Sequence, residues 1–115
     1  DPALDHGLIA LLDNAADAST AAGKEGVTLS LELADEVLLG RIEDQGGRPT
    51  AGQLPSARLY ASDKPGGLGL GLALSAAAFE AHGGAVEWLA GEAGLITRFR
   101  LPLAALRSEA EGSRP

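Results

Sequence analysis

The chain has 115 residues, a length typical of one folded domain, and its formal net charge at pH 7 is −7. It contains no Cys, which excludes a disulfide scaffold, a thiolate zinc site and a cysteine nucleophile. The acidic balance disfavours nucleic acid as a partner, and no apolar run approaches the roughly 18 residues that span a membrane.

The first predicted element is a helix over residues 4–22. Its apolar residues recur at intervals of three and four, which is the spacing of one helix face. Pro2 suits the first turn of such a helix, and Gly23 is expected to end it.

Two strands are predicted next. Val27, Leu29, Leu31 and Leu33 alternate with polar residues, a pattern that predicts a half-buried strand. Residues 37–43 read as its hairpin partner, after a short turn at 34–36. The following segment, 48–67, is rich in Pro and Gly and has no sustained period. A loop of this length is usually functional or disordered, and we expect it to lack order when no ligand is bound.

A second helix is predicted over residues 68–82, where Gly83 and Gly84 stop it and His82 caps its carboxyl end. Residues 86–89 and 96–101 read as another hairpin. Since two strands follow each helix, we expect an α/β (α+β) two-layer sandwich, with a mainly antiparallel sheet packed on one face against helices. The expected domain covers residues 1–103, and residues 104–115 form a polar tail.

Polar residues on the first helix form one candidate site. Asn14 lies four residues after Ala10 and Asp17 three residues after Asn14, so all three share one side of that helix. Amide and carboxylate oxygens are ligands that Mg²⁺ accepts alongside phosphates and water. A solvated helix face explains the same pattern without a ligand.

Two glycine-containing segments form the other candidates. Asp44 to Gly47 ends a strand, where a carboxylate beside glycines can accept a hydrogen bond from the amino group of a planar ligand; an ordinary tight turn is the alternative. Lys64 to Leu72 runs into a helix, with Gly67, Gly69 and Gly71 at alternate positions. Exposed backbone N–H groups at a helix start can hold phosphate, whereas a hinge or close helix packing needs no ligand.

Taken together, these segments resemble the ATP-binding domains shared by histidine kinases, type II topoisomerases and Hsp90-like chaperones. Residues 8–18 resemble the N box of that family, 44–47 its G1 box and 67–72 its G2 box. Ala81-His82-Gly83-Gly84 resembles the usual end of the following helix, and Leu101-Pro102-Leu103 the closing Leu-Pro of the histidine-kinase branch. The resemblance covers the chain from Asp1 to Leu103.

The resemblance implies a mixed sheet of about five strands under three helices, with ATP bound between the first helix and a lid loop. Carried over by position, Asn14 ligates Mg²⁺, Asp44 accepts from the adenine amino group and Gly46 lets the base approach. Asp17 helps the phosphates only through the metal. The phosphates receive backbone N–H groups, and Lys64 at the end of the lid supplies a cation. These phosphate donors are Gly67, Gly69, Leu70 and, by its place in the same box, Gly71.

The resemblance also distinguishes between branches of the family. Hydrolysing relatives carry a general-base Glu four residues before the Asn, and Ala10 at that position takes no proton. Transfer of the γ-phosphoryl to a histidine needs no such base. We therefore expect the catalytic domain of a sensor histidine kinase, with no phosphoacceptor His within the chain.

The resemblance implies a larger protein around this domain. Met is absent even at position 1, so we expect the chain to be a piece of a longer one. The parent is expected to be a homodimeric inner-membrane sensor with this domain in the cytoplasm. Its own dimerisation and phosphoacceptor domain receives the phosphoryl group, and a response regulator takes it next. Two alternatives stay open: a serine kinase that sequesters a sigma factor, and a scaffold in which Arg48 has ended nucleotide use.

Overall fold

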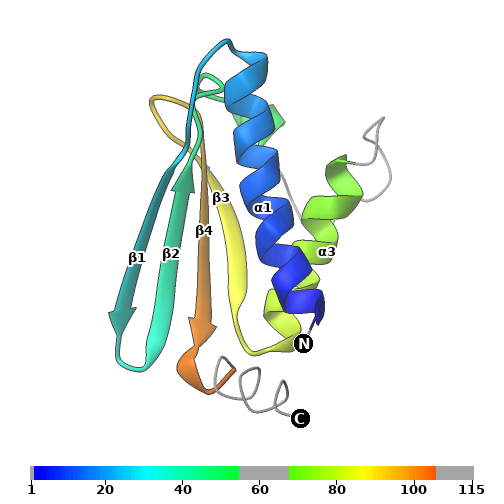
Figure 1. Ribbon diagram of the computed structural model, residues 1–115, viewed down its shortest axis with the longest axis vertical. Helices are drawn as coiled ribbons and strands as arrows, with labels where there is room; N and C mark the ends of the chain where they lie inside the picture. The colour runs from blue at the N-terminus through cyan, green and yellow to red at the C-terminus, as the bar shows by residue number, and fades with distance from the viewer. Residues whose placement is uncertain (1, 55–67, 106–115) are drawn as a thin grey trace.

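Four strands and two long helices form two layers in the computed structural model, which describes residues 2–54 and 68–105 (Figure 1). Helix α1 (Pro2–Ala21) is followed by the hairpin of β1 (Thr28–Ala34) and β2 (Val37–Glu43). A short 3₁₀ helix, η1 (Ala51–Gln53), lies near the end of the first described range. Helix α3 (Leu68–Ala81) then leads into the hairpin of β3 (Ala85–Ala90) and β4 (Leu95–Pro102). The two-layer fold class expected from the sequence is confirmed.

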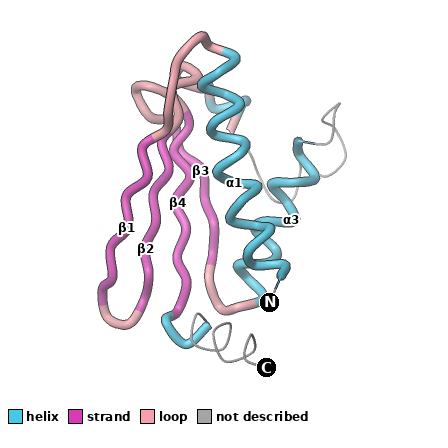
Figure 2. The backbone as a smooth tube through the Cα atoms, viewed as in Figure 1, coloured by secondary structure: helices cyan, strands magenta, loops and turns pink. Residues whose placement is uncertain are grey.

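The sheet has the order β1-β2-β4-β3 (Figure 2). Every neighbouring pair is antiparallel. The resemblance implied a mixed sheet of about five strands under three helices, whereas the described residues form four antiparallel strands under two α-helices. The turn between β1 and β2 contains only Asp35 and Glu36, both with positive φ (51° and 61°). Positive φ at both central residues matches the twist of the paired strands, which is why this hairpin closes in two residues.

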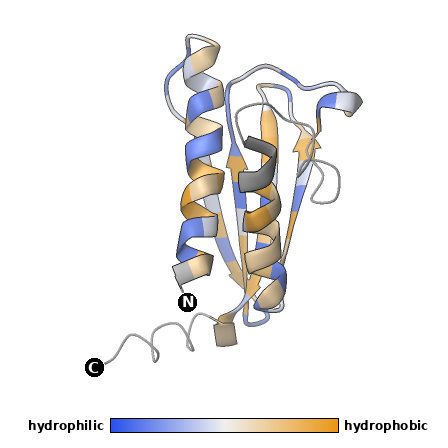
Figure 3. Ribbon diagram, turned by 90° about the vertical axis from the view of Figure 1, so that its right-hand side faces the viewer, coloured by the Kyte–Doolittle hydropathy of each residue, from blue (hydrophilic) through white to orange (hydrophobic). Residues whose placement is uncertain are grey.

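Both helices cover the same face of the sheet and lie side by side in front of it (Figure 3). Gly7 of α1 faces α3, because a Cβ there would lie in ordinary contact with it, 3.4 Å from Ser75 Cα and 3.5 Å from Ala78 Cβ. None of the helices in residues 2–54 and 68–105 has the length and apolar character needed to cross a membrane.

The core fills the space between this helical layer and the sheet. Phe79 of α3 is fully buried, and its ring meets Phe99 of β4 edge to face, with centroids 5.2 Å apart. The Phe99 ring in turn covers Gly40 of β2, where a Cβ would lie 2.1 Å from it. The buried cluster consists of Leu4, Leu11, Ala15, Ile42, Leu72, Ala76, Phe79, Trp88, Phe99 and Leu101.

The predicted half-burial of the first strand is wrong. Leu29, Leu31 and Leu33 share the helix-facing side of the sheet with their partners Ile42, Gly40 and Leu38. They are nevertheless 46%, 58% and 60% exposed, because the two helices pack mainly on each other and over the other strands. β1 is an edge strand whose leucines no described residue covers.

The predicted ends of the elements agree closely with the structure. Gly23 follows α1 with φ of 74°, and Gly83 follows α3 with φ of 82°. His82 caps α3 as expected, since its Nδ1 lies 2.9 Å from the carbonyl oxygen of Ala78. The chain makes a further helical turn at 103–105, and Ala105 is buried. We expected residues 48–67, the lid loop, to lack order without a ligand. Most of these residues lie outside those the structure describes.

The contrast between β1 and the core gives a prediction with a matched substitution. Leu11 is 1% exposed and Leu31 is 58% exposed. We expect Leu11→Ala to lower the free energy of unfolding by about 2–5 kcal/mol, since it leaves a cavity, and Leu31→Ala to change it by less than about 1 kcal/mol. Urea unfolding of both variants measures the difference; equal losses would show that the leucines of β1 are covered in solution.

Candidate nucleotide site

The centre of the candidate site is Asp44, which directly follows β2 and is only 2% exposed. Its Oδ1 accepts two backbone N–H groups, from Gly46 and from Leu95, each at 3.0 Å. The Asp44 N–H donates to the Leu95 carbonyl at 3.1 Å. No described residue donates a hydrogen bond to Oδ2, so one oxygen fixes the carboxylate and the other remains able to accept from a ligand.

The β3–β4 loop holds this carboxylate from one side. A Cβ on Gly94 would lie 2.0 Å from Asp44 Oδ1 and 2.5 Å from the Asp44 carbonyl oxygen. Only a residue without a side chain fits there. The Gly47 N–H donates to the Ala93 carbonyl at 2.9 Å, so the segment after β2 is fastened to the same loop.

Helix α1 holds the segment from the other side. The buried hydroxyl oxygen of Ser19 accepts the backbone N–H of Gln45 at 2.9 Å. The Gln45 side chain donates to the carbonyls of Glu25 and Gly26, at 2.7 and 3.2 Å. Gly46 packs closely on the helix, since a Cβ there would lie 3.1 Å from Ala18 Cβ. Close packing on α1 therefore explains this glycine, whatever its role toward a ligand.

Asn14 lies on the side of α1 that borders α3, and Asp17 follows it by three residues. Gly7 contacts α3, and Asn14 lies two turns further along the same side of the helix. The two helices run in opposite directions (Figure 1), so Asn14 is level with the first turn of α3. The Asn14 side chain is half-buried, whereas Asp17 is exposed. The segment that follows Asp44 contacts the same helix one turn further along, at Ala18 and Ser19.

The other predicted phosphate contacts are only partly described. Gly69, Leu70 and Gly71 lie in the first turn of α3, where free backbone N–H groups are expected at a helix start. Lys64 and Gly67 lie outside the described residues. Across the two described ranges, no three His, Asp or Glu side chains are grouped so that they could hold a metal ion.

Reading the sequence did not identify Ser19 and Gly94 as parts of this site. Their contacts join residues 26 and about 50 positions apart, which local patterns do not reveal. Ser19 sits in the last turns of the helix as an ordinary small residue, and Gly94 belongs to a hairpin loop where glycine is common. Buried Thr97, opposite Ile42 in the sheet, lies two residues beyond Leu95 on the same side.

The clearance around Gly94 gives a second prediction. Gly94→Ala would drive a methyl group into Asp44, so we expect it to lower the free energy of unfolding by about 1–3 kcal/mol. Gly52→Ala is the matched control, since a Cβ there meets nothing within 4 Å. Thermal unfolding compares the two. Equal stability of both variants would contradict the close packing of Gly94 on Asp44.

Comparison with known proteins places these features in a family. The family described as histidine kinase-, DNA gyrase B-, and HSP90-like ATPase matches residues 1–105. Among solved structures, the histidine kinase AdeS of Acinetobacter baumannii is similar, with a TM-score of 0.63 and 25% sequence identity. The match covers 89% of this chain and 46% of that one, so the chain spans about half the length of the solved AdeS chain. No curated protein sequence matches. The chain belongs to the family of histidine kinase-, DNA gyrase B- and HSP90-like ATPases and carries its ATP-binding domain.

Proposed function

We propose that this domain binds Mg·ATP and donates the γ-phosphoryl group to a histidine on a separate dimerisation domain. The observation that carries the proposal is the state of the Asp44 carboxylate. It is buried at a strand end, one oxygen is saturated by two backbone N–H groups, and the other oxygen has no donor among the described residues. That second oxygen is not sealed from solvent, so a ligand that enters the site can donate a hydrogen bond to it.

In this proposal Asp44 recognises the base. Its Oδ2 accepts from the exocyclic amino group of adenine, while the bonds from Gly46 and Leu95 hold the carboxylate in place. Guanine carries a carbonyl oxygen where adenine carries that amino group, and two acceptors cannot form a hydrogen bond. The same geometry therefore favours adenine over guanine.

In this proposal the start of α3 binds the phosphates and one side of α1 binds the metal ion. Free N–H groups and the helix dipole at the first turn of α3 attract anions, which suits Gly69, Leu70 and Gly71 as backbone donors. Asn14 supplies an oxygen ligand to Mg²⁺, and Asp17 acts only through the metal. Lys64, as a cation, and Gly67, as a backbone donor, are the other two phosphate contacts proposed from the sequence. Bound Mg·ATP supplies the transferable phosphoryl group and the charge that neutralises its oxygens.

The absence of a base beside Asn14 favours transfer over hydrolysis. Ala10 lies one turn before Asn14 on α1, and its methyl group accepts no proton from water. Phosphoryl transfer to a histidine relies on positioning and electrostatic stabilisation, which this domain can provide without a general base.

The proposal extends to the protein around the domain. The parent is a homodimeric sensor in the inner membrane, and this domain lies in the cytoplasm. Phosphate passes from the histidine to a response regulator in a two-component system. AdeS, of which the chain matches about half, is a histidine kinase, and this similarity supports the assignment.

Asp44→Asn tests recognition of the base. Asn keeps a carbonyl oxygen for the Gly46 and Leu95 N–H groups, but it presents a donor where adenine also presents one. We expect ATP affinity to fall about tenfold to a hundredfold, as for loss of a hydrogen bond to a charged group. Isothermal titration calorimetry measures the change. Asp13→Asn, at an exposed position of α1, should bind as the original chain does. Unchanged binding by folded Asp44→Asn would remove Asp44 from the site.

Asn14→Ala tests the metal assignment. The variant should bind ATP without gaining affinity when Mg²⁺ is added, because the ligand oxygen on α1 is gone. Calorimetric titrations with and without Mg²⁺ measure this, and Thr20→Ala on the same helix is the control for an exposed side chain. A persistent gain of affinity with Mg²⁺ in Asn14→Ala would contradict the role of Asn14.

Phosphoryl transfer is tested on a longer piece of the parent that includes the dimerisation domain. With γ-labelled ATP, we expect acid-labile phosphate on a histidine there. Labelled serine on a bound protein would favour the sigma-factor-sequestering kinase. Absence of nucleotide binding at millimolar concentration, from folded protein, would favour the scaffold.

A further inference from the structure

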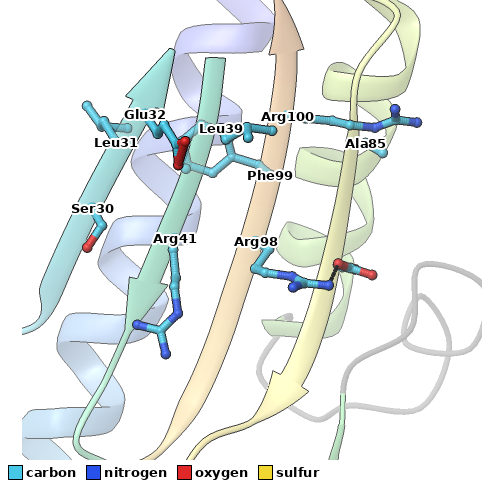
Figure 4. A pocket seen from close by; sticks show the side chains of 11 residues that line it. Ser30, Leu31, Glu32, Leu39, Arg41, Ala85, Arg98, Phe99 and Arg100 are labelled. Carbon is cyan, nitrogen blue, oxygen red and sulfur yellow. Dashed lines mark hydrogen bonds and ion pairs between the residues drawn. The ribbon is translucent and has the colours of Figure 1, made fainter. Parts of the chain in front are cut away.

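The sheet face that points away from the helices carries a groove of about 630 Å³. Residues of all four strands line it (Figure 4). The helices lie behind the sheet in this view, so the groove is on the opposite side from the candidate nucleotide site. Because its walls come from one sheet only, the groove is open to solvent on one side.

Three arginines are concentrated on the two central strands at this groove. The register places Arg41 of β2 directly opposite Arg98 of β4, and Arg100 is diagonal to Arg41. Directly opposite side chains on one sheet face have Cβ atoms about 4.5–5.5 Å apart, and like charges at that separation repel. The arrangement stands out in a chain whose net charge is −7.

Carboxylates compensate two of these arginines. Arg41 pairs with Glu43 on its own strand at 3.2 Å, and Arg98 pairs with Glu87 on β3. Arg100 is exposed and has no hydrogen bond or ion pair with any residue the structure describes. An anion placed over the centre of the sheet would reach Arg100, which has no carboxylate paired with it among the described residues.

From this groove we infer a docking surface for an acidic, extended segment of a partner protein, whose carboxylates lie over Arg41, Arg98 and Arg100. Side chains of an extended chain repeat every two residues on one face, which matches the Arg98-to-Arg100 spacing. Half-exposed Leu39, opposite Arg100, supplies apolar contact beside the charges. This surface is separate from nucleotide binding, so either proposal can fail alone.

Other occupants fit the groove less well. A nucleic acid carries a charge at every phosphate and cannot keep all of them away from Glu32, Glu43 and Glu87, whereas an extended peptide that is acidic at alternate residues can place its carboxylates over the arginines. A second copy placed with this face against the same face would set arginine stripes against each other. A small molecule would remain largely exposed, whereas small-molecule sites bury most of the ligand.

The test uses synthetic peptides on the isotopically labelled chain. A peptide of four Glu-Thr repeats is the probe, and a peptide of four Gln-Thr repeats is its neutral control. We expect amide shifts on β2 and β4 with the acidic peptide alone, and binding that weakens with added salt. Arg100→Gln should weaken binding about fivefold, the effect of one exposed charge pair. Lys24→Gln, which removes one charge outside the groove, should leave the affinity unchanged.

The other outcomes would overturn the proposal. These are equal binding of the neutral peptide, amide shifts confined to other surfaces, or equal weakening by Lys24→Gln. A single-stranded oligonucleotide of equal charge that binds the groove more tightly than the acidic peptide would replace the protein partner by a nucleic acid. We expect Arg100→Gln to bind ATP with unchanged affinity, so a loss of peptide binding in this variant does not reflect a loss of nucleotide binding.

Discussion

The hydrogen bonds around Asp44 join parts of the chain that are distant in sequence. One carboxylate oxygen holds the segment after β2 to the start of β4, while Gln45 is held to α1 by Ser19. The candidate site therefore depends on how the two hairpins and the first helix pack against one another. A buried carboxylate with one oxygen used for structure and one free is positioned before any ligand arrives, so binding needs little rearrangement of this group.

Local patterns predicted the elements because helix and strand ends depend on nearby residues. Gly23, Gly83 and His82 act within one turn of the helices that they end. The burial of β1 could not be predicted in the same way. Alternating leucines show that a strand has an apolar side, but whether that side is covered depends on how far the helical layer extends across the sheet. Here two helices are narrower than four strands, and β1 lies beyond them.

The candidate site also depends on contacts that local sequence patterns do not reveal. Asp44 and Asn14 could be proposed from the sequence because their motifs are short and their chemistry is specific. Ser19 and Gly94 support Asp44 through contacts that only the folded chain creates. Residues that position a functional group are thus harder to predict than the group itself, because small side chains carry no distinctive chemistry.

Alternation along the strands lets the two faces of the sheet differ without conflict. Arg41 and Ile42 are neighbours in sequence, yet Ile42 is fully buried beneath the helices and Arg41 lies in the open groove. Changes at Arg41, Arg98 or Arg100 therefore alter the charge of one face while the packing under α1 and α3 is retained. A partner on the open face would contact β2 and β4, the strands that lead to Asp44 and Leu95, so these two strands connect the open face with the candidate site.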